Sequence, residues 1–327
     1  MRTGAHGYRA GAVGLAPLLR LSIIWNVIRG INWILVGLAV AASVLTAGCG
    51  GGGDSGGKPR VVATTSPIGA LVREVAGDRV ALTVLIGPGV SAHDFEPSPK
   101  DVRALDGAAV IFANGIGLDA FLDKVLSGAA KSRVVTVTEG VKLLKGGEKS
   151  GDDDPHVWHD TENDKIIVAN IATALSAADA ANAAVYQQNA AAYQAKLDET
   201  DRQVRALIDT IPAANRKMVT NHDAFGYFMA RYGLEYVGAI IPGLSSDAQP
   251  SAADIAKLED TIRRTGVKAI FAEDEVDPKV AREISKDTGV KVVADLYADS
   301  LGKPGSGAET VHGMLLSNAK KIADALK

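Results

Sequence analysis

The chain contains an internal repeat that restricts its possible folds more than any other feature. The segments Arg60–Gly77 (RVVATTSPIGALVREVAG) and Arg216–Gly233 (RKMVTNHDAFGYFMARYG) each read as a short apolar strand, a polar turn and an amphipathic helix. Two further pairs of segments match downstream: Ile86–Leu105 with Ile241–Leu258, and Ala108–Asn114 with Val267–Glu273. A repeat of roughly 150 residues is too long for a solenoid and predicts two similar domains.

The repeat predicts an α/β fold with two similar β/α lobes, each with a mainly parallel sheet flanked by helices. We place the N-terminal lobe at residues 59–181 and the C-terminal lobe at residues 212–327. Ligands of open α/β sheets bind beyond the carboxyl ends of the strands, so two facing lobes predict a site in the cleft between them.

An Ala-rich region between the lobes predicts one long backbone helix at residues 182–211. Its apolar residues fall three, four or seven apart on one face: Tyr186, Tyr193, Leu197, Val204, Leu207, Ile208 and Ile211. A helix of about 30 residues spans about 45 Å, which is long enough to join two lobes. The alternative is an ordinary packed helix within one domain.

The N-terminus has the layout of a cleaved export signal. Residues 31–48 form an apolar run that follows Arg29 and ends in small residues before Cys49, which predicts a signal peptide at residues 1–48. The residues Leu45–Cys49 resemble a bacterial lipobox, so Cys49 is the expected acylation site and the Gly-rich residues 49–58 the tether. We therefore expect an exported protein, lipid-anchored to the outer face of the cell membrane.

Two questions about this N-terminus stay open. An uncleaved anchor helix, or a buried free cysteine at Cys49, is the alternative to a lipid anchor. Residues 1–28 form a basic, Gly-rich extension that is long for a signal peptide, so the start codon could also lie downstream of Met1.

Charge and cysteine content exclude several functions. Residues 1–48 hold four arginines and no acidic residue, so their removal moves the net charge from −3 to −7. The mature chain is acidic and has no clustered Lys/Arg footprint, which argues against nucleic-acid binding. Cys49 is the only cysteine, which excludes intrachain disulfides and thiolate metal clusters.

Three of the six histidines lie in loops that follow predicted strands: His93, His156 and His222. Such loops point into the predicted cleft. Imidazole suits zinc, copper, iron and nickel, whereas magnesium and calcium prefer oxygen ligands, so a histidine cluster indicates a transition metal. Because histidine binds metal only when neutral, affinity should fall as the pH drops through about 6.

A divalent ion removed from water also needs an anionic ligand. Asp299 and Glu273 each follow a predicted strand of the second lobe and could reach the cleft. Either could instead be a helix cap or a solvated acid.

The sequence resembles the zinc and manganese substrate-binding lipoproteins of bacterial ABC importers, the cluster A-I or TroA-like family. The resemblance covers Arg60–Lys327 and includes four ordered motifs. These motifs are His93–Ser98 (HDFEPS), Asp154–Trp158 (DPHVW), His222–Phe228 (HDAFGYF) and Asp299–Gly302 (DSLG).

The resemblance implies the ligands, the fold and the partners. The implied ligands are His93, His156, His222 and Asp299, in a cleft between lobes that one long helix joins with little freedom of movement. The implied partners are an ABC permease and its ATPase, and we expect a monomer without catalytic activity.

The third implied ligand carries the metal preference. Manganese and iron members of this family tend to have Glu where zinc members have His, and here the residue is His222. The sequence therefore favours Zn²⁺ as the transported ligand, with Mn²⁺ or Fe²⁺ as the alternative.

Four features depart from the family or leave roles open. The loop Gly140–Asp154 carries three aspartates where zinc members often have histidines, and could gather metal weakly or be a solvated loop. The stretch Glu273–Glu275 makes the local surface more acidic. Glu273 could orient a ligand histidine by accepting its second N–H. His159 is expected not to bind metal, although its three-residue spacing from His156 permits chelation.

Two other classes of function compete with metal delivery. A secreted zinc hydrolase would also use histidines and a carboxylate, but the chain has neither H-E-x-x-H nor G-x-S-x-G, and four protein ligands would close the shell to substrate. A surface adhesin would bind host ligands independently of metal, and nothing in the sequence singles out a face for that.

Overall fold

The computed structural model describes residues 57–146 and 151–327, in which Lys58–Lys327 form one compact unit. The predicted signal peptide, the acylation site Cys49 and nearly all of the tether lie outside the described residues. Within the described ranges, no helix is both long and apolar enough to cross a membrane. Because the unit has its own hydrophobic core, we expect it to fold without the residues before it.

The N-terminal sheet has four parallel strands in the order β2-β1-β3-β4. The strands are β1 (Arg60–Thr65), β2 (Ala81–Ile86), β3 (Val110–Ala113) and β4 (Val134–Thr136). The helices of this half are α2 (Ser66–Ala76), α3 (Pro99–Asp106), α4 (Phe121–Val125) and α5 (Thr161–Ala178). The central strands β1 and β3 are buried along almost their whole length, which explains their continuous apolar sequences.

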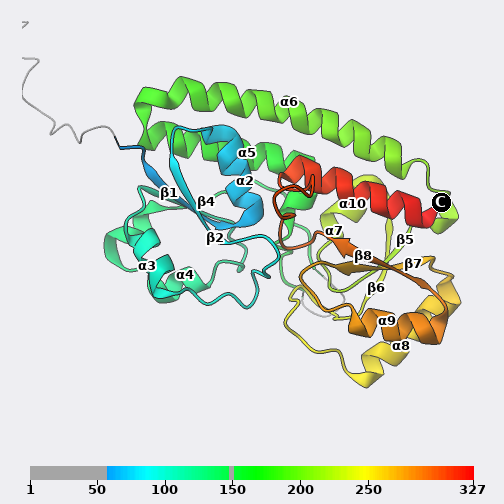
Figure 1. Cartoon of the computed structure of the whole chain (residues 1–327). Coiled ribbons are helices and arrows are strands. Elements are labelled where there is room, and N and C mark those ends of the chain that lie inside the picture. The colour runs from blue at the N-terminus through cyan, green and yellow to red at the C-terminus, as the bar shows by residue number, and fades with distance from the viewer. Residues whose placement is uncertain (1–56, 147–150) are drawn as a thin grey trace, which may run out of the picture. The chain divides into compact units, whose positions relative to one another are not determined.

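The C-terminal sheet repeats this topology with four parallel strands in the order β6-β5-β7-β8. The strands are β5 (Lys217–Thr220), β6 (Glu235–Ala239), β7 (Ala269–Glu273) and β8 (Lys291–Leu296). The helices are α7 (Gly226–Tyr232), α8 (Ala252–Thr265), α9 (Lys279–Thr288) and α10 (Val311–Leu326). The predicted fold of two similar parallel-sheet lobes is confirmed (Figure 1).

The long helix α6 (Ala183–Ile208) runs along both lobes (Figure 1). It packs on α5 and α2 of the first lobe and on α10 and α7 of the second. Its buried face is the predicted apolar stripe, including Tyr186, Leu197 and Val204. One hydrophobic core continues beneath this helix from the N-terminal lobe into the C-terminal lobe, so the lobes share buried surface and do not only meet at a hinge.

The loop between β2 and α3 in the first lobe and the loop between β6 and α8 in the second lobe both end in a helix capping box. Ser98 and Asp101 form a capping box at the start of α3, and Ser251 and Asp254 form one at the start of α8. Each helix follows the second strand of its lobe, β2 or β6, after a long loop. The two loops therefore occupy equivalent positions in the repeat.

Candidate metal centre

The structure brings together the four residues predicted as metal ligands. His93, His156, His222 and Asp299 each offer one nitrogen or oxygen atom, and these atoms lie within 4.8 Å of one another, between the lobes. His93 lies in the loop between β2 and α3, and His156 in the segment between β4 and α5. His222 follows β5, and Asp299 follows β8. The first two come from the N-terminal lobe and the other two from the C-terminal lobe.

The candidate ligand atoms are closely spaced. The Nε2 atom of His156 lies 3.3 Å from Nε2 of His93 and 3.4 Å from Nε2 of His222. The Oδ1 atom of Asp299 lies 3.3 Å from Nε2 of both His156 and His222. His156, His222 and Asp299 are fully or almost fully buried, whereas His93 is partly exposed. The group is therefore shielded from water on most sides.

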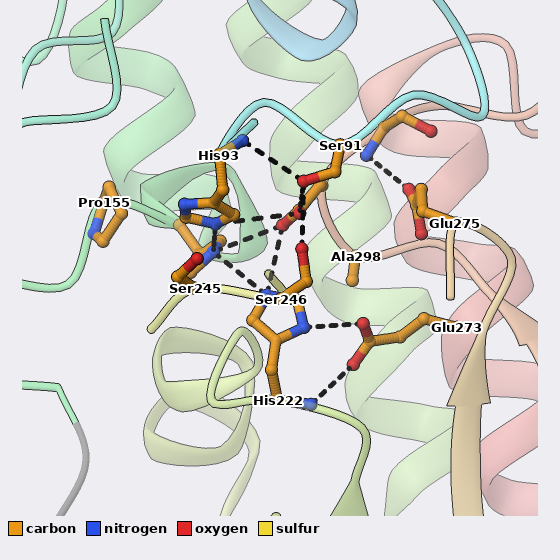
Figure 2. Close-up of polar contacts among 12 residues, drawn as sticks. Ser91, His93, Pro155, His222, Ser245, Ser246, Glu273, Glu275 and Ala298 are labelled. Atoms are coloured by element: carbon orange, nitrogen blue, oxygen red, sulfur yellow. Dashed lines mark hydrogen bonds and ion pairs between the residues drawn. The ribbon is translucent and has the colours of Figure 1, made fainter. Parts of the chain in front are cut away.

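His222 is held by the register of the C-terminal sheet. Thr220 at the end of β5 pairs with Phe271 of β7, so His222 and Glu273 each lie two residues further along. Glu273 Oε2 lies 2.6 Å from His222 Nδ1, and Oε1 accepts the backbone N–H of His222 at 3.2 Å (Figure 2). The carboxylate therefore accepts the Nδ1 proton and turns Nε2 toward the centre, the contact expected for Glu273.

His156 has its own carboxylate partner, which our sequence reasoning did not predict. Asp154 Oδ1 lies 2.7 Å from His156 Nδ1 and accepts the backbone N–H of His156 at 2.9 Å. Asn114 then donates from Nδ2 to the carbonyl of Pro155 at 3.0 Å. The sequence held a signal for Asp154, because an aspartate two residues before a histidine can reach that imidazole.

The segment after His156 also holds the backbone next to Asp299. Trp158 Nε1 and His159 Nε2 lie 2.9 and 3.0 Å from the carbonyl oxygen of Ala298, to which both donate. His159 is fully buried and is not part of the candidate ligand group. His159, the second histidine of the PHVWH stretch, thus forms a hydrogen bond from the N-terminal lobe to Ala298 of the C-terminal lobe.

The stretch Glu273–Glu275 is less exposed than the expected acidic surface, and two aspartates of the loop before His156 have partners. Glu273 is buried, and Glu275 accepts the backbone N–H of Ser300 at 2.7 Å, so neither simply adds charge to the surface. In the loop before His156, Asp153 pairs with Lys145 at 2.7 Å and Asp154 is buried against His156. These contacts support structural roles for both residues.

The carboxylates shift the pKa values of two histidines upward. Burial alone would lower the pKa of His156, but Asp154 and Asp299 raise it to about 9. Burial likewise opposes protonation of His222, but Glu273 and Asp299 raise its pKa well above the usual range. Without metal, both imidazoles are therefore in the positively charged form at neutral pH, with a proton on each ring nitrogen.

The remaining ionisable groups of the centre shift in the opposite direction. Burial lowers the pKa of His93 to about 4, although Asp299 acts against this. Burial also lowers the pKa of His159 to about 3, with a further contribution from His156. Burial alone would raise the pKa of Asp299, but the neighbouring His222 and His156 hold it well below its usual range, so Asp299 is ionised.

Comparisons with known proteins agree with this arrangement. Residues 61–325 match the family described as zinc-uptake complex component A, periplasmic. The chain is 34% identical over 300 residues to the manganese ABC transporter substrate-binding lipoprotein PsaA of Streptococcus mitis, covering 88% of this chain and 96% of that protein.

Solved structures give the same result. The periplasmic zinc binding protein TroA of Treponema pallidum superposes with a TM-score of 0.77 at 32% identity, covering 83% of this chain and 99% of that one. A manganese-bound periplasmic metal binding protein from Candidatus Liberibacter asiaticus superposes with a TM-score of 0.75 at 26% identity, covering 83% and 100%.

Proposed function

The chain belongs to the zinc-uptake complex component A family, the metal-binding substrate-binding proteins of ABC importers, and on this premise we propose that it captures Zn²⁺ outside the cytoplasm. The bound ion is then passed to an ABC permease driven by its ATPase. Zn²⁺ is the cargo of this protein, and His93, His156, His222 and Asp299 are its ligands.

The spacing of the four ligand atoms is the observation that supports zinc. Four ligands about 2.0–2.1 Å from one tetrahedral zinc ion lie about 3.3 Å from one another. The separations of 3.3 and 3.4 Å around His156 Nε2, and of 3.3 Å from Asp299 Oδ1, match this value. The His93 side is wider, with His93 Nε2 3.7 Å from Asp299 Oδ2 and the four atoms within 4.8 Å of one another. Three imidazoles and one carboxylate are also a typical zinc set.

Manganese is the second candidate cargo. The relative from Streptococcus mitis is named for manganese, and the Liberibacter structure contains it. Affinity rises along the Irving–Williams order, so tight zinc binding in vitro would not by itself exclude manganese as the physiological cargo. The ratio of the two affinities decides between the candidates.

The finer features of the proposal follow from the sequence and the site. Lipid attachment at Cys49 would hold the protein at the outer face of the membrane, as the lipoprotein names of relatives suggest. One copy of the chain supplies all four ligands, which supports a monomer. Four protein ligands fill a tetrahedral shell and leave no position for a catalytic water, which argues against a hydrolase.

Calorimetry on residues 50–327, stripped of metal and titrated with zinc and manganese, tests the proposal. We expect one equivalent of zinc to bind tightly, and manganese to bind at least about a thousandfold more weakly. His222→Ala should abolish tight binding, whereas His312→Ala on α10, outside the centre, should not. Trp158 packs edge-on to His156 with ring centroids 5.6 Å apart, so its fluorescence gives a second readout.

Other outcomes have defined meanings. Manganese binding within about tenfold of zinc would make manganese, or both metals, the cargo. If neither metal binds, the ligand assignment is wrong.

A further inference from the structure

The two carboxylate oxygens of Asp299 have different surroundings. Oδ1 faces the Nε2 atoms of His156 and His222 at 3.3 Å, and within the described residues no donor makes a hydrogen bond to it. Oδ2 accepts a hydrogen bond from the hydroxyl of Ser91 at 3.3 Å. Oδ1 is therefore free to bind an ion, whereas Oδ2, which lies 3.7 Å from Nε2 of His93, already has a hydrogen-bond partner in Ser91.

The hydroxyl of Ser91 is oriented by two further contacts. Its Oγ atom accepts the backbone N–H of His93 at 3.2 Å and lies 2.9 Å from Oγ of Ser246 (Figure 2). A hydroxyl has one proton and two lone pairs. If Ser246 donates to Ser91, both lone pairs of Ser91 are used and its proton points to Asp299.

Ser91 and Ser246 belong to opposite lobes. Ser246 lies five residues before the capping residue Ser251 of α8, and His93 lies five residues before the capping residue Ser98 of α3. Ser246 therefore occupies the position in the second lobe that His93 occupies in the first. The hydrogen bonds from Ser246 through Ser91 to Asp299 connect the lobes beside the candidate ligands.

The coordination number of the ion depends on the second oxygen of Asp299. Zinc in a four-ligand site needs one oxygen, whereas manganese favours more oxygen ligands and a higher coordination number. Bidentate binding by Asp299 would require Oδ2 to turn toward the ion, out of the orientation in which the hydroxyl of Ser91 holds it. A hydrogen bond to a charged group changes an equilibrium constant by roughly ten- to a hundredfold.

We propose that Ser91 is a specificity-determining residue that keeps Asp299 monodentate and so favours zinc over manganese. This inference rests on the proposed function and deepens it, since it assigns part of the metal preference to a residue outside the ligand set. Ser246 acts through Ser91, as a positioning residue for its hydroxyl.

The test compares four variants of residues 50–327 by competition titration with zinc and manganese. In Ser91→Ala we expect the preference for zinc to fall about tenfold or more, mainly because manganese binds more tightly. Ser246→Ala should change the ratio in the same direction but less. Ser91→Thr keeps the hydroxyl and should preserve the ratio. Ser245→Ala is the matched control, because Ser245 accepts the N–H of Asp247 and, among the described residues, forms no hydrogen bond with the hydroxyl of Ser91.

Spectroscopy separates a change in coordination from a loss of structure. The electron paramagnetic resonance spectrum of bound manganese should change in Ser91→Ala and not in Ser245→Ala, while the thermal melting of both stays cooperative. An unchanged metal ratio in Ser91→Ala, or an equal loss of affinity for both metals, would overturn the role of Ser91. If the unsubstituted protein binds neither metal, the proposed function fails instead.

Discussion

The two lobes share one topology but hold their ligands through different chemistry. Their central strands β3 and β7 are followed by, or end in, a polar residue at equivalent positions of the repeat: Asn114 in the first lobe and Glu273 in the second. Glu273 contacts the imidazole of His222 directly, with Oε2 2.6 Å from Nδ1. Asn114 holds the carbonyl of Pro155, the residue before His156. The same position of the repeat therefore holds a ligand segment in both lobes, with an asparagine in the first lobe and a glutamate in the second.

The difference follows from how each ligand reaches the centre. His222 lies two residues beyond β5, and Glu273 ends the neighbouring strand, so sheet register alone brings them together. His156 arrives on a long segment after β4 and depends on three other contacts: Asp154 within its own segment, Asn114 of its own lobe and Tyr227 of the other lobe. The ligand of the first lobe is thus held partly by the second.

The largest expected effect concerns the release of protons when zinc binds. His156 and His222, which have carboxylate partners, release protons, whereas His93 has a lowered pKa and has none to release. Despite burial, carboxylates raise the pKa of His156 to about 9 and that of His222 well above its usual range, so zinc must displace both protons at neutral pH. We expect about two protons to leave per ion, and zinc affinity to fall up to about a hundredfold per pH unit from pH 9 to 7. Affinity then depends on pH well above the value of about 6 expected from unperturbed histidine.

Calorimetry at one pH in buffers of different ionisation enthalpy measures the number of protons released. The stability of the metal-free protein changes with pH in the opposite direction to its zinc affinity. Protonated His156 stabilises the metal-free fold fully below pH 6.5, and this contribution is lost as the pH rises through about 9. Metal-free protein should therefore melt at lower temperature as the pH rises from 6.5 to 9. Zinc binding without proton release at pH 7.5 would show that the imidazoles are neutral beforehand.

The second prediction concerns the contact between Glu273 and His222, which the register of the C-terminal sheet brings together. Glu273→Gln keeps the shape of the side chain but removes the charge that favours the Nδ1 proton of His222. We expect zinc affinity to fall about 10–100-fold, the usual range for loss of such a partner. Equilibrium titration against a chelator of known affinity measures this. Glu259→Gln on α8, where Glu259 pairs with Arg263, is the control and should leave affinity unchanged.

The sequence predicted what depends on local pattern and failed where the lobes meet. The repeat, the long helix and the candidate ligands come from motifs and periodicity, which are properties of short segments. The contact of Ser91 with Ser246, and that of His159 with Ala298, join residues far apart in the chain. Such pairs depend on how two lobes pack, which no local pattern contains. Asp154 is different, because its contact with His156 is local and could have been inferred.

The third prediction concerns Asn114, whose side-chain amide occupies the position in the first lobe that Glu273 occupies in the second. Asn114→Ala loses the hydrogen bond to Pro155 and leaves that carbonyl without this partner. Because Asp154 still orients the ring of His156, we expect zinc affinity to fall less than about tenfold, and the free energy of unfolding by about 1–3 kcal/mol. Urea unfolding and zinc titration of the same variant measure both. A larger loss of affinity than in Glu273→Gln would reverse the order of importance argued for the two lobes.

The smallest expected effect concerns Tyr227, through which the second lobe supports the ligand of the first. Its hydroxyl donates to the carbonyl of Asp154 at 3.0 Å and accepts the N–H of Leu144 at 3.1 Å. The neighbouring Gly226 allows this approach, because a Cβ there would lie 2.8 Å from Asp154 Oδ2. Both contacts involve the segment that leads to His156, so Tyr227 connects it to the helix that follows His222.

Tyr227→Phe keeps the buried ring and removes only the hydroxyl. We expect the free energy of unfolding to fall by about 1 kcal/mol and zinc affinity to fall about threefold, since the ligands themselves keep their carboxylate partners. Tyr297→Phe is the matched control, because Tyr297 is half-buried and its hydrogen bonds with Asn318 use only the backbone atoms of Tyr297. If Tyr227→Phe leaves affinity unchanged while stability falls, His156 is held by its own lobe alone, and the interlobe contact serves the fold but not the site.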